Sequence, residues 1–327
     1  MNIIVIGGSG FVGSLLVQRL LDLKHTVTII DKRKSELFPK LWKFGDIRDL
    51  EGFQALCKGG EVIINLAAEH RDDVTPISLY YDVNVGGSRN VCIAASKNKI
   101  NRIIFTSSVA IYGVASGAGD EDAPRHPFNH YGKSKLEAES VYNEWQAKSK
   151  NHTLSIIRPT VIFGENNRGN VYNLLKQMAS NKFLMVGNGK NVKSMAYIKN
   201  IVEFIIYNVN NPKPYLCANY TDKPDFSMNE LVGTVMDTLG KKLFPFRAPF
   251  FLALLGGYVF DFAAFITRKK LPISSIRIKK FCMNTRFSSK YTHTGFAPPY
   301  TLREGLIQTI TYEFINPPLS RITFTTE

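Results

Sequence analysis

A glycine-rich turn directly after a short apolar run is the feature that most constrains the fold of this chain. Residues 3–6 (Ile-Ile-Val-Ile) predict a buried strand, and Gly7-Gly8-Ser9-Gly10-Phe11-Val12-Gly13 follows at once. Glycines permit a tight turn and a close backbone approach to a pyrophosphate, and the N-terminus of the next helix supplies amide donors and a positive dipole end. We therefore expect a strand, a phosphate-binding loop and a helix, with Gly7, Gly10, Phe11, Val12 and Gly13 at the ligand.

An acidic residue stands where such a loop needs one. Asp31 ends the second predicted strand, 21 residues after Gly10. A carboxylate at this place hydrogen-bonds ribose hydroxyls and repels a 2′-phosphate, which favours NAD over NADP. Lys32 and Arg33 follow directly, and either side chain is long enough to reach a phosphate, so the choice of cofactor stays open at this point.

The first half of the chain alternates short apolar runs with helical stretches. The helical stretches include Gly13–Leu23 and Pro76–Lys99. This alternation predicts an α/β fold of Rossmann type, a doubly wound parallel sheet with right-handed crossovers. The predicted strands are Asn2–Ile6, Thr26–Asp31, Val62–Leu66, Ile103–Ser107 and Leu154–Arg158.

The alternation ends after Gly164, and loops and turns follow. We expect a dinucleotide-binding domain over residues 1–165, to which the chain returns around 195–220. Residues 166–327 then form mainly a smaller, mixed α/β substrate domain.

Composition excludes several classes of protein. With 44% hydrophobic and 21% charged residues, the 327-residue chain is neither disordered nor collagen-like nor a coiled coil. Its four cysteines are far apart and form no Cys-x-x-Cys pair, which argues against a disulfide framework or a zinc site and suits a reducing cytoplasm. We expect no metal. The N-terminus has no basic stretch before its first apolar run, so no cleaved secretion signal is expected.

The net charge of +14 is concentrated in one window. Residues 241–303 contain twelve Lys/Arg and a single acidic residue, Asp261, whereas the rest of the chain is only at +3. Inside the window lies the 17-residue apolar segment Phe250–Ile266, which is short of the ~20 residues of a spanning helix and contains Asp261 and a Gly-Gly pair. Two interpretations stay open for 247–280: a segment lying in the interface of an anionic bilayer, or a buried or lid helix beside a solvated basic surface. No nucleic-acid motif accompanies the charge.

A serine, a tyrosine and a lysine form the candidate catalytic group. Tyr131 and Lys135 are four residues apart and share one face of a helix, and Ser108 follows the fourth predicted strand. A free tyrosine has a pKa of about 10, but a nearby ammonium favours the phenolate and makes the tyrosine usable as an acid/base. The hydroxyl of Ser108 can hydrogen-bond the substrate oxygen whose proton Tyr131 takes.

These motifs together resemble the extended short-chain dehydrogenases/reductases, the NAD-dependent sugar epimerase/dehydratase family. The resemblance covers essentially the whole chain and implies the fold given above with NAD as the cofactor. It places Asp46 and Ile47 near the adenine, Leu66, Ala67 and Ala68 with Asn84 on the cofactor side, and Pro159 on the strand leading over the nicotinamide.

Longer runs resemble one bacterial group in this family, the 4-epimerases whose N-acetylhexosamine is carried on undecaprenyl diphosphate for O-antigen synthesis. They include residues 67–74, 127–135, 163–176 and 193–197. This resemblance implies substrate contacts at Ser108, Asn170 and Lys193, with Lys193 at the diphosphate. It also implies a peripheral place on the cytoplasmic face of the inner membrane, and it leaves a homodimer open.

Several alternatives remain on sequence alone. The chain has Val161 and Lys193 where soluble UDP-sugar 4-epimerases carry Asn and Arg, yet a soluble UDP-N-acetylhexosamine 4-epimerase stays the second hypothesis. A 4,6-dehydratase is disfavoured because Val109-Ala110 replace the acid/base pair that this chemistry requires. A 3β-hydroxysteroid-type dehydrogenase and, from another class, a non-catalytic NAD-binding scaffold complete the set.

Overall fold

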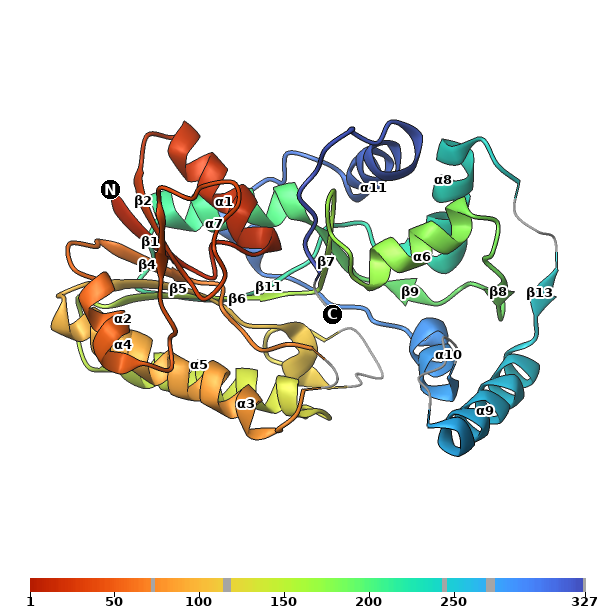
Figure 1. Ribbon diagram of the computed structural model, residues 1–327, viewed down its shortest axis with the longest axis horizontal. Coiled ribbons are helices and arrows are strands. Elements are labelled where there is room, and N and C mark those ends of the chain that lie inside the picture. The colour runs from red at the N-terminus through yellow and green to blue at the C-terminus, as the bar shows by residue number, and fades with distance from the viewer. Residues whose placement is uncertain (72–73, 114–118, 243–245, 269–273, 326–327) are drawn as a thin grey trace.

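The computed structural model describes residues 1–71, 74–113, 119–242, 246–268 and 274–325 (Figure 1). Within these ranges the chain forms one seven-stranded sheet with helices on both faces, followed by a second region of short strands and helices. The predicted α/β fold with a Rossmann-type doubly wound sheet is confirmed.

All seven strands of the main sheet are parallel, in the order β11-β6-β5-β4-β1-β2-β3. The direction of winding reverses between β1 and β4, and in such sheets ligands bind at the carboxyl ends of the strands at this point. The strands are β1 (Asn2–Ile6), β2 (Thr26–Asp31), β3 (Trp42–Phe44), β4 (Val62–Asn65), β5 (Arg102–Thr106), β6 (Thr153–Pro159) and β11 (Tyr215–Tyr220).

Two helical layers cover the sheet. On one face lie α1 (Phe11–Asp22) and α7 (Ile198–Asn210), and on the other lie α2 (Leu50–Leu56), α3 (Ser78–Tyr81), α4 (Gly87–Lys97) and α5 (His130–Ala147) (Figure 1). Each layer has its own apolar core of Val, Ile, Leu and aromatic side chains, because strands buried on both faces present apolar residues to both sides.

The strand predictions hold to within about one residue at most ends, but two strands of the sheet lay outside them. β3 is short and half exposed, and β11 follows a long excursion of the chain. The predicted helix Pro76–Lys99 is interrupted, since a π-helical turn over Asp82–Gly86 separates α3 from α4.

The second region is built on three two-stranded sheets. β7 (Val161–Phe163) pairs with β10 (Met195–Tyr197), β9 (Val192–Lys193) with β12 (Phe226–Ser227), and β8 (Met185–Val186) with β13 (Arg247–Ala248). Three helices, α6 (Asn170–Ala179), α8 (Met228–Leu239) and α11 (Leu302–Ile310), accompany them. The chain returns to the main sheet between these elements, through α7 and β11.

A helical hairpin leaves the second region at its outer end (Figure 1). It consists of α9 (Phe250–Thr267) and α10 (Ser275–Cys282). The apolar segment found in the sequence therefore continues as a helix through Gly256-Gly257. The interpretation of this segment as a buried helix is wrong, because Gly257 is the only residue of α9 that is buried, whereas its interpretation as a lid helix stays a prediction. Lys269 and Lys270, part of its predicted basic flank, lie outside the described residues.

Candidate active site

The glycine loop is shaped by close backbone contacts. A Cβ on Gly13 would lie 2.4 Å from the carbonyl oxygen of Gly7, and one on Gly7, whose φ is +76°, would lie 2.8 Å from the amide nitrogen of Ala67. The loop thus joins the end of β1 to the first turn of α1 and to the segment after β4 with no room for side chains. This is the switch point of the sheet, where a phosphate is expected.

The loop also offers donors that lack an acceptor. α1 begins after Gly10, which provides no side-chain cap, and its first turn carries no acidic residue. The hydroxyl oxygen of Ser9 is buried and has no hydrogen-bond partner. Polar groups of this kind are normally satisfied. The residues present therefore fit a bound pyrophosphate, with Phe11 and Val12 in the first turn of α1 beside it.

Asp31 lies at the end of β2 facing this loop. Its carboxylate accepts hydrogen bonds from the amide of Ser9, at 3.1 Å, and from the amide of Arg33, at 2.9 Å. The side chain is thus held beside the glycine loop, where the sequence predicts a ribose contact. Lys32 is exposed to solvent.

The remaining residues predicted at the cofactor lie along the same edge of the sheet. The carboxylate of Asp46 accepts hydrogen bonds from the guanidinium and the amide of Arg48, and the buried Ile47 packs against Gly87 at the start of α4. Leu66, Ala67 and Ala68 follow β4, and the buried Pro159 ends β6.

The side chain of Asn84 makes its hydrogen bonds within the protein. Its amide group donates to the carbonyl of Glu69 and to the hydroxyl of Ser134, and its oxygen accepts from the amide of Glu69. All three bonds are 2.9 Å long, so Asn84 fixes the segment after Ala68 against α5. The structure makes it a positioning residue in the π-helical turn before α4.

Ser108, Tyr131 and Lys135 come together at the carboxyl end of β5. Ser108 begins a 3-10 turn, Val109–Tyr112, and its oxygen accepts from the amide of Ala110. Tyr131 and Lys135 lie in the first two turns of α5. A Cβ on Gly132 would lie 2.5 Å from the carbonyl oxygen of Ala110, so the first turn of α5 packs directly on the backbone after Ser108.

The surroundings of Tyr131 affect the ionisation of its phenol. Burial raises the pKa of Tyr131, and the nearby hydroxyl of Ser108 lowers it. Lys135 is 2% exposed, and its ammonium donates to the carbonyl of Thr106 at 2.8 Å and faces the ring of Phe105. Burial lowers the pKa of Lys135 to about 7, and the carboxylate of Glu139 acts in the opposite direction.

A buried ion pair supports these residues, and sequence reasoning missed it. Arg158 of β6 binds both carboxylate oxygens of Glu139, at 2.7 and 2.8 Å, and donates to the hydroxyl of Tyr112 at 2.7 Å. The pair therefore connects α5, the turn after Ser108 and strand β6. The available signal was the position of Glu139, four residues after Lys135 on the same helical face.

Of the three residues predicted at the substrate, Lys193 and Asn170 lie in the second region. Lys193, on β9, donates to the carbonyls of Lys280 and Met283 at 2.9 and 2.7 Å, and burial lowers its pKa to about 8. Asn170 is exposed at the first position of α6, after a Gly169 that provides no side-chain cap.

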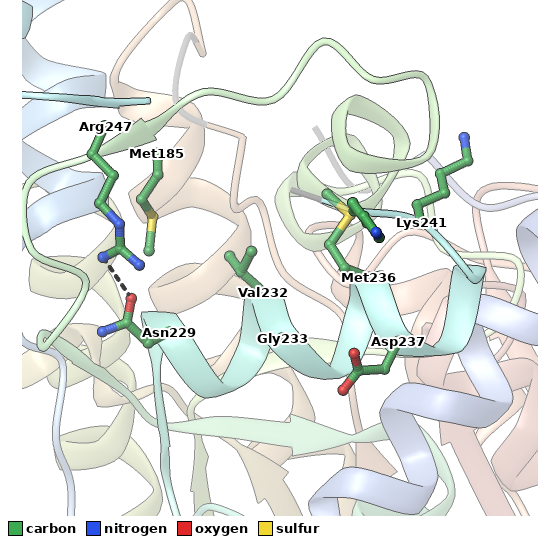
Figure 2. A pocket seen from close by; sticks show the side chains of 9 residues that line it. Met185, Asn229, Val232, Gly233, Met236, Asp237, Lys241 and Arg247 are labelled. Carbon is green, nitrogen blue, oxygen red and sulfur yellow. Dashed lines mark hydrogen bonds between the residues drawn. The ribbon is translucent and has the colours of Figure 1, made fainter. Parts of the chain in front are cut away.

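A separate cavity of about 370 Å³ opens between β8, α8 and β13 (Figure 2). Asn229, Gly233 and Asp237 line it along α8, and the guanidinium of Arg247 donates to the side-chain oxygen of Asn229 across its end. None of Ser108, Tyr131 and Lys135 lines this cavity, so it does not belong to the catalytic group.

The parallel sheet, the phosphate loop at its switch point and the Ser-Tyr-Lys group beside it define a dinucleotide-dependent enzyme of the short-chain dehydrogenase/reductase type. The chain belongs to the NAD dependent epimerase/dehydratase family, whose model matches residues 3–217. It is an isomerase, a sugar epimerase with NAD as its cofactor, as the sequence motifs predicted.

Known proteins match this chain over all or nearly all of its length. It is 51% identical over 329 residues to the N-acetyl-alpha-D-glucosaminyl-diphospho-ditrans,octacis-undecaprenol 4-epimerase of Escherichia coli O157:H7, and the match covers 100% of this chain and 99% of that protein. The fold matches UDP-glucose 4-epimerase of Thermotoga maritima, solved with UDP-glucose, with a TM-score of 0.76 and 20% identity over 95% of this chain and 98% of that one. It also matches UDP-glucose 4-epimerase of Thermus thermophilus in complex with NAD, with a TM-score of 0.74, 20% identity and the same coverage.

Proposed function

We propose that this protein interconverts N-acetylglucosamine and N-acetylgalactosamine while the sugar is carried on undecaprenyl diphosphate, by epimerisation at carbon 4 through a transient 4-keto sugar. The reaction type rests on one observation, the placement of Ser108, Tyr131 and the buried Lys135 together where β5 ends and α5 begins. The carrier rests on the similarity of the whole chain to an epimerase of that substrate.

Of the catalytic residues, one transfers a proton and another positions the substrate oxygen. Tyr131 takes the proton of the 4-hydroxyl and later returns it, while Ser108 hydrogen-bonds the same sugar oxygen and holds it at the phenol. Burial opposes ionisation of Tyr131 in the cofactor-free protein, so the phenolate needs positive charge nearby. Lys135, which lies one turn from Tyr131 on α5, supplies part of that charge.

The dinucleotide would be held along the carboxyl edge of the sheet. Its pyrophosphate would lie at the loop from Gly7 to Gly13, its adenine-side ribose at Asp31, and its adenine near Asp46 and Ile47. When bound, NAD supplies reversible hydride transfer at carbon 4, so no net oxidation occurs and no external reductant is needed.

The carrier diphosphate would lie between the second region and the sheet. Lys193 offers an ammonium whose three N–H donors are not all used by the two carbonyls that it binds. Asn170 presents its amide at the start of α6, where a helix N-terminus favours an anion. A lipid carrier requires the enzyme to work at a membrane surface, and we assign it to the cytoplasmic face of the inner membrane as a peripheral protein.

The test compares carriers directly. Purified protein without added reductant should convert undecaprenyl-diphospho-N-acetylglucosamine dispersed in detergent, and it should convert UDP-N-acetylglucosamine at least ~100-fold more slowly, as measured by chromatography of the released sugars. Conversion of the nucleotide sugar alone would refute the lipid-linked substrate.

The Tyr131→Phe variant tests the chemistry in the same assay. Losing a general acid/base lowers the rate ~10²–10⁴-fold. Bound NAD and the melting temperature serve as controls for folding. Unchanged turnover in this variant would show that the phenol is not the acid/base.

A further inference from the structure

The α9–α10 hairpin presents its large apolar side chains to the outside. Six of them, Phe251, Leu255, Val259, Phe262, Phe265 and Ile266, are each more than 60% exposed. At ~100° per residue these six lie within about 120° of the circumference of α9. A contiguous apolar surface of this kind marks a site of contact with a protein or a membrane.

The side of α9 opposite the apolar stripe carries mostly small residues, with Phe260 as the large exception. Ala253, Gly257 and Ala264 lie opposite the apolar stripe, and α10 packs there so closely that a Cβ on Gly257 would lie 2.8 Å from the Cα of Ser275. A helix that covers a protein core has the reverse arrangement, with large apolar residues inward. Small residues at helix contacts with apolar residues outward are typical of helices immersed in lipid.

Asp261, the acidic residue within the apolar segment, does not face outward. Its two carboxylate oxygens accept from the amide of Ser275, at 3.2 and 3.4 Å, at the N-terminus of α10. A carboxylate is favourable at this end of a helix. At the other side of the hairpin, the ammonium of Lys279 donates to the hydroxyl of Tyr258 at 3.0 Å. These contacts hold α9 and α10 as one unit.

The hairpin cannot span a bilayer while both of its ends remain attached to the same region of the protein. α9 has the length and composition of a spanning helix, but its 18 residues are preceded by β13 and followed by α10, and both lead back to the same region of the protein. β13 pairs with β8, and the chain after α10 runs beside β9, where Lys193 is bridged to Thr285. α10 has eight residues, about 12 Å, which is too short for a return crossing.

The net positive charge around the hairpin favours anionic lipid as its partner. Residues 247–280, which contain the hairpin, carry seven Lys/Arg and one acid, Asp261, which is already bound to α10. Two copies of the hairpin face to face would bring these positive charges together, whereas anionic lipid headgroups would neutralise them. We propose that the α9–α10 hairpin enters one leaflet of an anionic bilayer with the stripe from Phe251 to Ile266 among the acyl chains.

Docking of this hairpin also sets the height of the substrate site above the membrane. Lys193 donates to the carbonyls of Lys280 and Met283 at the end of α10, and Asn191 donates to the carbonyl of Phe281 at 2.9 Å. The ammonium proposed to bind the diphosphate is therefore attached to the element that enters the lipid. This keeps Lys193 close to the headgroup level, where a diphosphate-linked sugar emerges, and this consequence rests on the proposed function.

Vesicle flotation tests the docking without reference to activity. The wild type should float with vesicles of phosphatidylglycerol and phosphatidylcholine, and not with phosphatidylcholine alone. The double variant F262Q/F265Q should bind at least about tenfold more weakly, because two exposed phenylalanines lose their transfer into lipid. The matched control L23Q/I93Q changes two exposed apolar residues, at the end of α1 and on α4, and should float like the wild type.

Activity then separates docking from catalysis. F262Q/F265Q should lose turnover on the lipid-linked sugar in vesicles and keep it on the same sugar diphosphate with a short, water-soluble prenyl chain. Equal loss on both substrates, or normal flotation of this variant, would overturn the docking. Retention of the wild type on vesicles through an alkaline carbonate wash would show a spanning helix instead. If the wild type floats but converts neither lipid-linked substrate, the proposed function fails while the docking stands.

Discussion

Lys135 lies in surroundings that oppose its charge. It is almost fully buried, and its ammonium meets one carbonyl, one aromatic ring and, further along α5, the carboxylate of Glu139. Burial lowers its pKa to about 7, well below the value of about 10.4 in an unfolded chain. The cofactor-free site therefore binds fewer protons than the unfolded chain between these two values.

This difference predicts how stability depends on pH. Because the folded pKa of Lys135 is lowered, the unfolded state holds the extra proton above pH 7, and the free energy of unfolding rises with pH by up to about 1.4 kcal/mol per pH unit until about pH 10. Urea unfolding of NAD-free wild type and Lys135→Met at pH 6, 7.5 and 9 measures this. Between pH 7.5 and 9, the free energy of unfolding of the wild type should rise relative to that of the variant. Parallel curves for the two proteins would mean that Lys135 keeps its ordinary pKa.

The buried pair of Glu139 and Arg158 gives a second prediction. Glu139→Gln leaves the guanidinium of Arg158 buried without its carboxylate, and this should destabilise the protein by ~3–5 kcal/mol. The double variant E139M/R158M removes both charges and should recover part of that loss. Thermal melting compares the two variants. A double variant less stable than E139Q would show that the ion pair itself, rather than the unpaired charge, governs stability.

Sequence reasoning found the residues with a local signature and missed those whose role depends on packing. Ser108, Tyr131 and Lys135 were predicted because a strand end and a four-residue helical spacing place them in order. Glu139, Arg158 and Tyr112 meet only after α5 packs against β6, so their partners could not be predicted from spacing along the chain.

At the scale of elements, two helical glycines, one in α1 and one in α8, differ in the space available for a side chain. Gly13 in α1 has no space for a side chain, because a Cβ would meet the backbone of Gly7 and Gly8 at 2.4–2.8 Å. Gly233 lies inside α8 at the cavity of Figure 2, and nothing lies within 4 Å of the place where its Cβ would be. The first glycine is required by a contact, and the second only lowers helix stability.

Alanine should therefore have opposite effects at the two positions. Gly233→Ala should stabilise the protein by ~0.5–1 kcal/mol, through helix propensity alone. Gly13→Ala should destabilise it and abolish retention of NAD, because the loop must open to admit the methyl group. Denaturant unfolding and the NAD content after gel filtration measure both effects. Normal NAD content in Gly13→Ala would contradict the proposed place of the pyrophosphate.

The element that the sequence described least well is α9. Its Gly-Gly pair and Asp261 counted against a spanning helix in the sequence, but Gly257 allows α10 to approach and the aspartate binds the N-terminus of α10. Gly257 and Asp261 both serve the contact between α9 and α10. No local pattern in the sequence indicates such a contact.

At the scale of the molecule, the C-terminal tail connects the two regions that form the site. The amide of Phe324 donates to the carbonyl of Asn166, and its carbonyl accepts from the amide of Arg168, at 2.9 and 2.8 Å. The ring of Phe324 lies 6.1 Å from that of Phe11, at the start of α1 beside the glycine loop. The tail therefore crosses from the loop before α6 to the first turn of α1. The strand and helix pattern provided no indication of this path.

Removal of the tail should consequently weaken the hold on the cofactor. Deleting residues 319–327 removes both Phe324 hydrogen bonds, the ring contact with Phe11 and the ion pair of Arg321 with the buried Glu313. At ~0.5–1.5 kcal/mol for each hydrogen bond, the melting temperature should fall by a few degrees. NAD should dissociate faster, because Phe11 loses a neighbour at the entrance to the pyrophosphate loop. The NAD content after repeated gel filtration, compared with that of the Phe324→Ala variant, measures this effect, and the point variant should show a smaller change in the same direction. A truncated protein that keeps its NAD through these steps would show that the tail supports the fold without closing the cofactor site.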